Sequence, residues 1–165
     1  AYICVVDIDP GTAKVTVRRF VAVDDCGTRI NPMIIEGQVH GGLTDGVGMA
    51  LMEMISFDED GNCLSGSLMD YGLPRADTVP PFKTEIAEVL SPTNPLGIKA
   101  GGEGGTTGAP AVVVSAIVDA LRDYGVRDIK MPATPYNIWR TIQDAKIRDA
   151  KTSPDAQTNQ DAKRA

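Results

Sequence analysis

Two apolar runs near the N-terminus predict an antiparallel hairpin. Residues 2–8 and 14–23 are rich in Val, Ile and Phe, which favour β-strands. Residues 9–12, Asp-Pro-Gly-Thr, separate the two runs and have the composition of a turn. The second run ends near Asp24, where Asp, Cys and Gly replace the apolar residues. We therefore expect a strand, a turn and a second strand.

A long helix is predicted from Pro32 to about Ile55. Its apolar residues recur at every fourth position, as they do on one face of a helix: Val39, Leu43, Val47 and Leu51. The same segment contains a set of glycines: Gly37, Gly41, Gly42, Gly46 and Gly48. Each glycine costs a helix about 0.5–1 kcal/mol relative to alanine. Two explanations stay open for this cost, namely tight packing of another backbone against the helix and close approach of a ligand.

Downstream segments continue this mixture of strands and helices. The patterns predict a hairpin over 55–67, a strand over 82–90, a helix from Pro110 to Tyr124, a strand over 127–131 and a helix from Thr134. A Gly-rich loop over 91–110 leads into the first of these helices, and a loop of this length in a compact domain is usually functional. Because no regular strand–helix–strand repeat occurs, we assign the fold to the α+β class, with helices packed on antiparallel hairpins.

Composition and charge narrow the class of protein. The chain has 165 residues, and its hydrophobic content of 42% suffices for the core of one domain. A net charge of −6 and an aromatic content of 5% argue against nucleic-acid binding, which depends on clustered Lys and Arg. No apolar run approaches the roughly 18 residues of a membrane span. We expect residues 1–150 to fold together. Residues 151–165 lack large apolar side chains, and we expect a disordered polar tail there.

Cysteine and histidine usage argues against the common metal sites. Cys4, Cys26 and Cys63 are far apart and form no CxxC pair, so neither a disulfide scaffold nor a thiolate zinc site is expected. Unpaired thiols are typical of a reducing compartment, and we expect a cytoplasmic location. His40 is the only histidine, and we interpret it as a hydrogen-bonded structural residue. We expect this chain to supply no metal ligand.

Two side chains in Gly-rich surroundings are candidates for chemistry. Glu103 has two glycines on each side, Gly101 and Gly102 before it and another pair after it. Glycines let a ligand approach the carboxylate and the backbone closely, so Glu103 is a candidate general base; the alternative is a surface carboxylate on a flexible loop. The amide of Gln38 offers donors and an acceptor that suit a heterocycle or a phosphate; the alternative is an ordinary polar helix residue.

Several motifs together resemble a known family. They are residues 24–32 (DDCGTRINP), 36–42 (EGQVHGG), 68–74 (LMDYGLP) and 99–110 (KAGGEGGTTGAP). The first three resemble the large subunit of the aerobic carbon monoxide dehydrogenases and, more broadly, the xanthine dehydrogenase family of molybdenum hydroxylases. The fourth resembles the Lys-Gly-x-Gly-Glu loop that carries this family's active-site glutamate. The resemblance runs in order from residue 1 to about residue 145.

The resemblance implies a cofactor and a role for each candidate residue. Family members bind molybdopterin with molybdenum, in bacteria commonly as the cytosine dinucleotide. Glu103 matches the glutamate that acts as base toward a molybdenum-bound hydroxyl, with water as the oxygen source. Gln38 matches a glutamine that contacts the pterin, and Gly101 and Gly102 match glycines that line it. The implied substrates are small: carbon monoxide, an aldehyde or an aromatic N-heterocycle.

The resemblance also implies partners. FAD and [2Fe–2S] clusters are expected on other chains, a FAD-binding medium subunit and an iron–sulfur small subunit. Family large subunits are much longer than this chain, which resembles their C-terminal portion, so the remainder of the large subunit is expected as a further partner or as further sequence. One departure is Ala100, where Gly is usual. A hypothesis of another class also stays open: a non-catalytic assembly module that uses its Gly-rich segments for packing.

Overall fold

The first two strands form the expected hairpin and belong to a mixed sheet. The structure, a computed structural model, describes residues 1–152. Strand β1 (Tyr2–Ile8) pairs antiparallel with β2 (Val15–Asp24), and β2 pairs in parallel with β3 (Phe82–Ile86), which gives the order β1-β2-β3. In the turn, Asp9 Oδ1 accepts the N–H of Gly11 at 3.0 Å and of Thr12 at 2.6 Å. The predicted hairpin is confirmed, and the strand predicted over 82–90 is present but ends at Ile86.

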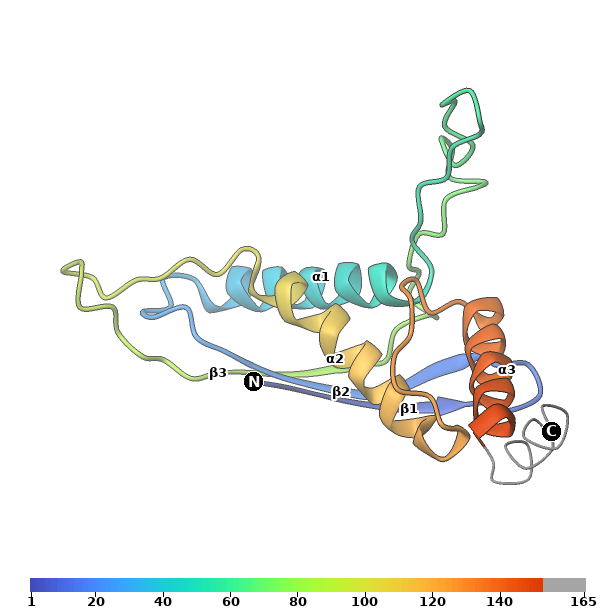
Figure 1. Cartoon of the computed structure of the whole chain (residues 1–165). Helices are drawn as coiled ribbons and strands as arrows, with labels where there is room; N and C mark the ends of the chain where they lie inside the picture. Colours follow the sequence, from blue (N-terminus) through green and yellow to red (C-terminus); the bar gives the residue numbers. More distant parts are fainter. Residues whose placement is uncertain (153–165) are drawn as a thin grey trace, which may run out of the picture.

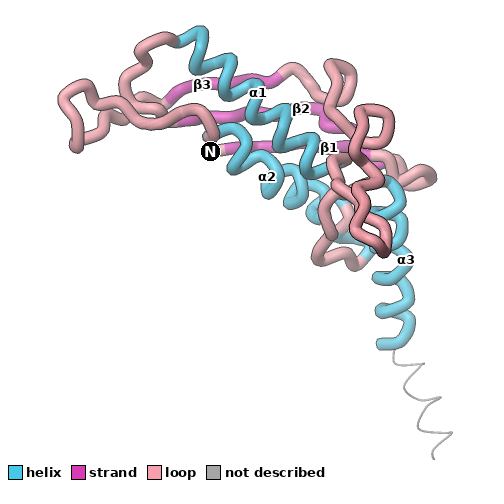
Figure 2. The backbone as a smooth tube through the Cα atoms, turned by 90° about the horizontal axis from the view of Figure 1, so that it is seen from above, coloured by secondary structure: helices cyan, strands magenta, loops and turns pink. Residues whose placement is uncertain are grey.

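Helices cover one face of this sheet. α1 (Pro32–Leu51) and α2 (Gly104–Ala120) pack against each other and against the strands, with α2 over β1 and α1 towards β3 (Figures 1 and 2). The core between these elements is fully apolar: Val17, Phe20, Ala22, Val39, Leu43, Val47, Ala109, Val113 and Ile117. On the other face of the sheet, Ile3 is 65% exposed. The layered arrangement confirms the α+β class.

A short 3₁₀ turn and a third helix complete the described chain. After α2 come η1 (Arg122–Tyr124) and Gly125, whose φ of +75° ends the turn. α3 (Pro135–Thr152) begins as predicted, because the hydroxyl oxygen of Thr134 accepts the N–H of Asn137 at 3.2 Å. Apart from the last two residues of α3, the segment 151–165 lies outside the described residues, and its expected disorder stays a prediction.

Other expected elements differ from the structure in their bounds or are absent from it. α2 begins at Gly104 and carries Pro110 inside the helix, because Gly105 must pack on α1 before Pro110 is reached. α1 ends at Leu51, before the expected Ile55. The predicted strand over 127–131 is wrong: the segment forms no strand, and Ile129 is its one buried residue. The predicted hairpin over 55–67 reduces to one bridge between Phe57 and Cys63.

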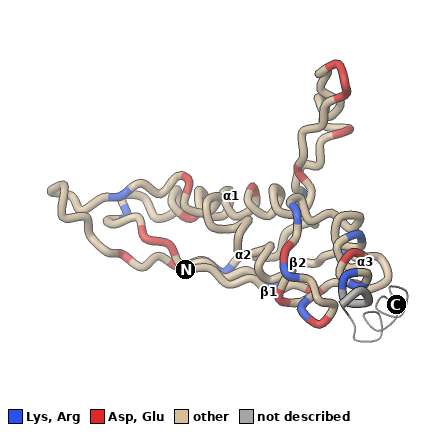
Figure 3. Tube along the Cα trace, in the orientation of Figure 1, with Lys and Arg blue, Asp and Glu red and all other residues tan. Residues whose placement is uncertain are grey.

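Two extensions leave this body. Residues 52–81 form an arm that projects beyond the C-terminal end of α1, and residues 87–103 form a loop beyond its N-terminal end (Figure 1). The tip of the arm carries acidic side chains (Figure 3). Seven large apolar side chains along the arm are exposed: Met54, Ile55, Phe57, Leu64, Leu68, Met69 and Leu73. Within residues 1–152, no helix combines the length and the apolar character that crossing a bilayer requires.

Candidate functional site

Three segments that are distant in sequence meet at the N-terminal end of α2. They are residues 24–31 after β2, the first half of α1 and the loop 96–103. The backbone N–H of Lys99 donates to the Cys26 carbonyl at 2.9 Å, and the N–H of Thr28 donates to the Gly97 carbonyl at 3.2 Å. The structure therefore brings three of the four quoted motifs together.

The crossing of the two loops requires glycine. Gly27 has a φ of +62°, and a Cβ placed on it would lie 2.1 Å from the carbonyl oxygen of Gly97. A side chain at this position would thus meet both backbone strain and a steric clash. Gly27 lets the loop that carries Glu103 approach the end of β2.

An ion pair ties the same two loops together. Asp25 Oδ2 lies 2.5 Å from Lys99 Nζ, and Asp25 Oδ1 accepts the N–H groups of Gly27 at 2.9 Å and Val89 at 3.1 Å. The hydrogen bond from Lys99, followed by these backbone N–H groups, lowers the pKa of Asp25 to about 2. One carboxylate therefore joins three segments of the chain.

A second polar cluster lies on the other side of Glu103. The hydroxyl oxygen of Tyr2 lies 2.6 Å from Asp24 Oδ1 and 2.7 Å from the carbonyl oxygen of Gly104. Burial, and then the hydrogen bond to Asp24, raises the pKa of Tyr2, so the hydroxyl keeps its proton for these two acceptors. Asp24 Oδ2 is buried and has no hydrogen-bond partner within residues 1–152.

α1 and α2 contact each other through glycine, at a place we call the helix crossing (Gly42, Gly46 and Gly105). A Cβ on Gly42 would lie 2.8 Å from the backbone nitrogen of Thr106, and one on Gly105 would lie 2.7 Å from the carbonyl oxygen of Val39. The Thr106 hydroxyl also donates to the Gly42 carbonyl at 3.3 Å. Tight backbone packing thus explains part of the glycine content of α1.

Gly48, near the C-terminal end of α1, is also packed, with its Cβ position 2.3 Å from an atom of Pro74. The remaining two glycines of α1 lie on an open surface, which we call the open rim (Gly37, Gln38, Gly41, Gly102 and Glu103). A Cβ on Gly37 or Gly41 would meet no atom within 4 Å. Gln38 Nε2 lies 3.5 Å from the Cβ position of Gly102, so the rim joins α1 to the loop. Packing within the described chain gives no reason for glycine at these two helix positions.

The predicted site residues all lie at or beside this rim. Glu103 is the N-cap residue of α2, but its carboxylate makes no capping hydrogen bond. The residue is exposed. Its backbone carbonyl accepts the Thr107 hydroxyl at 3.0 Å, whereas its carboxylate forms no hydrogen bond or ion pair with the described residues. Gly101 precedes it, with its Cβ position 3.2 Å from the Cβ of Cys26. The structure therefore places Gln38, Gly101, Gly102 and Glu103 together and leaves both candidate side chains, those of Gln38 and Glu103, without hydrogen-bond partners in the described chain.

His40 has a structural role, as expected. Its Nε2 lies 3.1 Å from the hydroxyl oxygen of Thr84, and its ring is 5.9 Å from that of Phe82. It fastens α1 to β3 behind the rim. No group of three or more His, Cys, Asp or Glu side chains within residues 1–152 is arranged to hold a metal ion.

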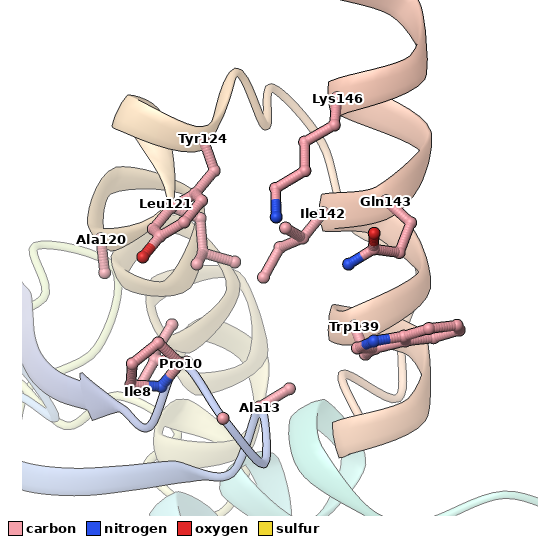
Figure 4. Close-up of a pocket in the computed structure, with 11 residues that line it drawn as sticks. Ile8, Pro10, Ala13, Ala120, Leu121, Tyr124, Trp139, Ile142, Gln143 and Lys146 are labelled. Atoms are coloured by element: carbon pink, nitrogen blue, oxygen red, sulfur yellow. The ribbon is translucent and has the colours of Figure 1, made fainter.

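Neither the 68–74 motif nor the pocket beside α3 belongs to the rim. The motif lies at the opposite end of α1, where the Tyr71 hydroxyl donates to Glu53 at 2.6 Å. A cavity of about 340 Å³ lies beside the C-terminal end of α2 (Figure 4). Its walls come from the β1–β2 turn, α2 and α3: Ile8, Pro10, Ala13, Leu121, Tyr124, Trp139, Ile142 and Lys146. α2 is roughly 25 Å long, so the cavity is remote from Glu103.

Sequence reasoning assigned no role to four residues that surround Glu103: Tyr2, Asp24, Asp25 and Lys99. Asp24, Asp25 and Lys99 lie within the quoted motifs, close to glycines in the sequence. Charged residues in such surroundings could have been interpreted as groups that hold a loop in place. Tyr2 gave no such signal, because its position in an apolar strand is typical of a core residue.

Comparisons with known proteins agree with this geometry. A family model for a molybdopterin cofactor-binding domain matches residues 1–80. The carbon monoxide dehydrogenase large chain of Hydrogenophaga pseudoflava is 47% identical over 146 residues, which are 88% of this chain and 18% of that protein.

Solved structures show the same similarity. Carbon monoxide dehydrogenase from Oligotropha carboxidovorans matches with a TM-score of 0.83 and 41% identity, over 89% of this chain and 18% of that one. Quinoline 2-oxidoreductase from Pseudomonas putida 86 matches with a TM-score of 0.80 and 43% identity, over 84% of this chain and 18% of that one. The chain therefore spans less than a fifth of the length of these relatives. Over that span, its sequence and its fold place it in the family of molybdopterin-binding large subunits that includes carbon monoxide dehydrogenase and xanthine dehydrogenase.

Proposed function

We propose that the open rim is part of the active site of a molybdenum-dependent hydroxylase, in which Glu103 is the catalytic base. The observation that carries the proposal is the convergence of Gln38 and the loop 101–103, with Gln38 Nε2 3.5 Å from the Cβ position of Gly102. Two candidates chosen for separate chemical reasons thus lie side by side, although they belong to different elements.

The rim residues fit a molybdopterin cofactor. A pterin has polar ring edges and a phosphate, so it needs donors, acceptors and room beside the backbone. Gln38 has no polar partner among the described residues, and Gly37 and Gly41 leave open space next to it. The first N–H groups of α2 also lack helical partners and suit an anionic group. Gln38, Gly101 and Gly102 would hold the cofactor, which supplies oxidation–reduction chemistry when bound.

Glu103 is suited to move a proton beside that cofactor. Its carboxylate makes neither a capping hydrogen bond nor an ion pair with the described residues, so its oxygens are free to accept a proton. The flanking glycines leave no side chain over it. In this role Glu103 takes up a proton during the oxidation of a small substrate, with water as the oxygen source.

The other components follow from the family. We propose the cytosine dinucleotide form of molybdopterin, and FAD and [2Fe–2S] clusters on a medium and a small subunit, in a cytoplasmic complex with the remainder of the large subunit. Carbon monoxide, an aldehyde and an aromatic N-heterocycle all stay candidates for the substrate, since solved relatives are named for carbon monoxide, quinoline and aldehydes.

Turnover per bound molybdenum in the assembled complex tests the role of Glu103. Glu103→Gln keeps the shape and removes the base, and we expect a loss of about 10²–10⁴-fold with molybdenum content near normal. Glu103→Asp should lose less, roughly 10²-fold, because it withdraws the carboxylate by about 1 Å. Glu59→Gln, at the tip of the arm, is the matched control and should leave turnover unchanged.

Gln38→Ala should behave differently from the Glu103 variants. It removes a cofactor contact and leaves the base in place, so molybdenum content should fall while turnover per remaining molybdenum stays close to that of the unmodified complex. Full turnover per molybdenum in Glu103→Gln would refute the catalytic role and would favour a module whose glycines serve packing alone.

A further inference from the structure

We propose that Asp24 and Asp25, two adjacent residues at the end of β2, are positioning residues that fix Glu103 from both sides. Asp25 holds the loop before Glu103 through Lys99, and Asp24 together with Tyr2 holds Gly104, the residue after it. The inference rests on the proposed function of Glu103 and names the residues that keep its carboxylate in place.

The clamp before Glu103 is an ion pair between segments 74 residues apart in sequence. Lys99 Nζ lies 2.5 Å from Asp25 Oδ2, and both side chains are about one-third exposed. Asp25 is itself held by the N–H groups of Gly27 and Val89. Because Asp25 is anchored by a backbone N–H group of its own segment and by one of the segment after β3, it is a fixed point to which Lys99 ties the loop.

The clamp after Glu103 is the Tyr2 hydroxyl, which lies between Asp24 Oδ1 and the Gly104 carbonyl at 2.6 and 2.7 Å. Asp24 Oδ1 is also 3.2 Å from the Cβ position of Gly104, so α2 begins directly against this carboxylate. The second oxygen of Asp24 is buried without a partner in the described part of the chain. An unpaired buried carboxylate oxygen lowers the stability of the fold. We take this cost as a sign that Asp24 serves to position Gly104 rather than to stabilise the chain.

The loop between the clamps needs them because it is rich in glycine. Gly101, Gly102, Gly104 and Gly105 flank Glu103 in sequence. Glycine has access to more backbone conformations than any other residue. A base misplaced by about 1 Å can cost roughly 10²-fold in rate. The same glycines that give a ligand access to Glu103 would leave its position undefined without the clamps.

The experiment measures kcat, KM and molybdenum content in the assembled, molybdenum-loaded complex. Lys99→Met removes the first clamp, and we expect kcat per molybdenum to fall about 10²-fold with KM and molybdenum content nearly unchanged. Lys99→Arg restores the ion pair and should recover most of this loss. Tyr2→Phe removes only the hydroxyl of the second clamp and should lower kcat several-fold.

Glu88→Gln is the matched control. It breaks the ion pair of Glu88 with Arg29, at 3.1 Å, which joins the same two regions but lies at the start of the 87–103 loop and does not involve Lys99 or Gly104. Its kcat should stay unchanged. A role limited to folding would instead lower the yield of complex, with no loss of kcat per molybdenum and no rescue by Lys99→Arg.

The outcomes separate this inference from the function on which it rests. If Glu103→Gln is inactive while Lys99→Met and Tyr2→Phe both keep full kcat, Glu103 is the base and the clamps are not its positioning residues. A loss of molybdenum in Lys99→Met, with unchanged turnover per remaining molybdenum, would also overturn the inference. If Glu103→Gln itself stays active, the proposed function fails first.

Discussion

The helix crossing and the open rim use the same residue type on the same helix for opposite purposes. At the crossing, Gly42 is buried and its Cβ position lies within 3.0 Å of backbone atoms of α2. At the rim, the next residue towards the N-terminus, Gly41, is exposed with no atom near its Cβ position. Neighbouring glycines thus meet either a packed backbone or open space.

This difference shows that packing accounts for only part of the glycine content. The crossing gives a sufficient structural reason for Gly42, Gly46 and Gly105. The rim has no such reason in the described chain, and a glycine in the interior of a helix still costs about 0.5–1 kcal/mol. In the proposed function, a bound group that approaches the backbone closely would account for that cost, and Gln38 and Glu103 lie beside the place where it would bind.

The largest effect on stability is expected at the crossing. Gly42→Ala places a Cβ against the backbone of Thr106 and Gly105, which cannot move aside as a side chain can. Overpacking of this kind costs about 1–3 kcal/mol or more. Thermal unfolding of the complex should show a lower melting temperature, and an unchanged one would mean that α1 and α2 do not cross at Gly42.

A smaller effect of opposite sign is expected at the rim. Gly41→Ala adds a Cβ to open space and should leave the folding stability equal or raise it by about 0.5–1 kcal/mol, since alanine favours the helix. Molybdenum content should fall, because the methyl group occupies the rim. If this variant unfolds as readily as Gly42→Ala, the rim is packed like the crossing and the contrast between them is lost.

The smallest effect is expected from the pH dependence of the Asp25 clamp. The pKa of Asp25 is about 2 in the folded chain, below the ordinary value of about 3.9. A lowered pKa stabilises the folded state above the unfolded value, and this contribution disappears as the pH falls through the folded value. The difference in melting temperature between the unmodified complex and Asp25→Asn should be constant above about pH 4 and should shrink towards pH 2. A difference that does not change with pH would show that the carboxylate charge is not involved.

Local sequence patterns predicted most helices and strands but not the contacts between them. The hairpin, α1 and α3 follow from strand-forming residues, an apolar stripe and a capping threonine. The start of α2 was misplaced because proline favours a first turn, whereas the contact of Gly105 with Val39 and Leu43 depends on a segment more than sixty residues away. The absent strand at 127–131 shows that a short segment read as a strand need not find a pairing partner in the fold.

The same limit applies to the site. Residue chemistry singled out Gln38 and Glu103, and the family motifs supplied their roles. No local pattern could divide the glycines of α1 into packed and open, since that division depends on where α2 crosses and on where Pro74 returns against Gly48. Tyr2 could not be found either, because only the fold brings its hydroxyl to Gly104.

The most direct test of the account is a structure of the assembled complex with its cofactor bound. The account predicts the pterin against the open rim, with a polar atom within about 3 Å of the Gln38 amide, the backbone of Gly101 and Gly102 alongside, and the Glu103 carboxylate facing the reacting centre. A structure in which protein side chains cover Gly37, Gly41 and Gly102, with the cofactor bound elsewhere, would contradict it.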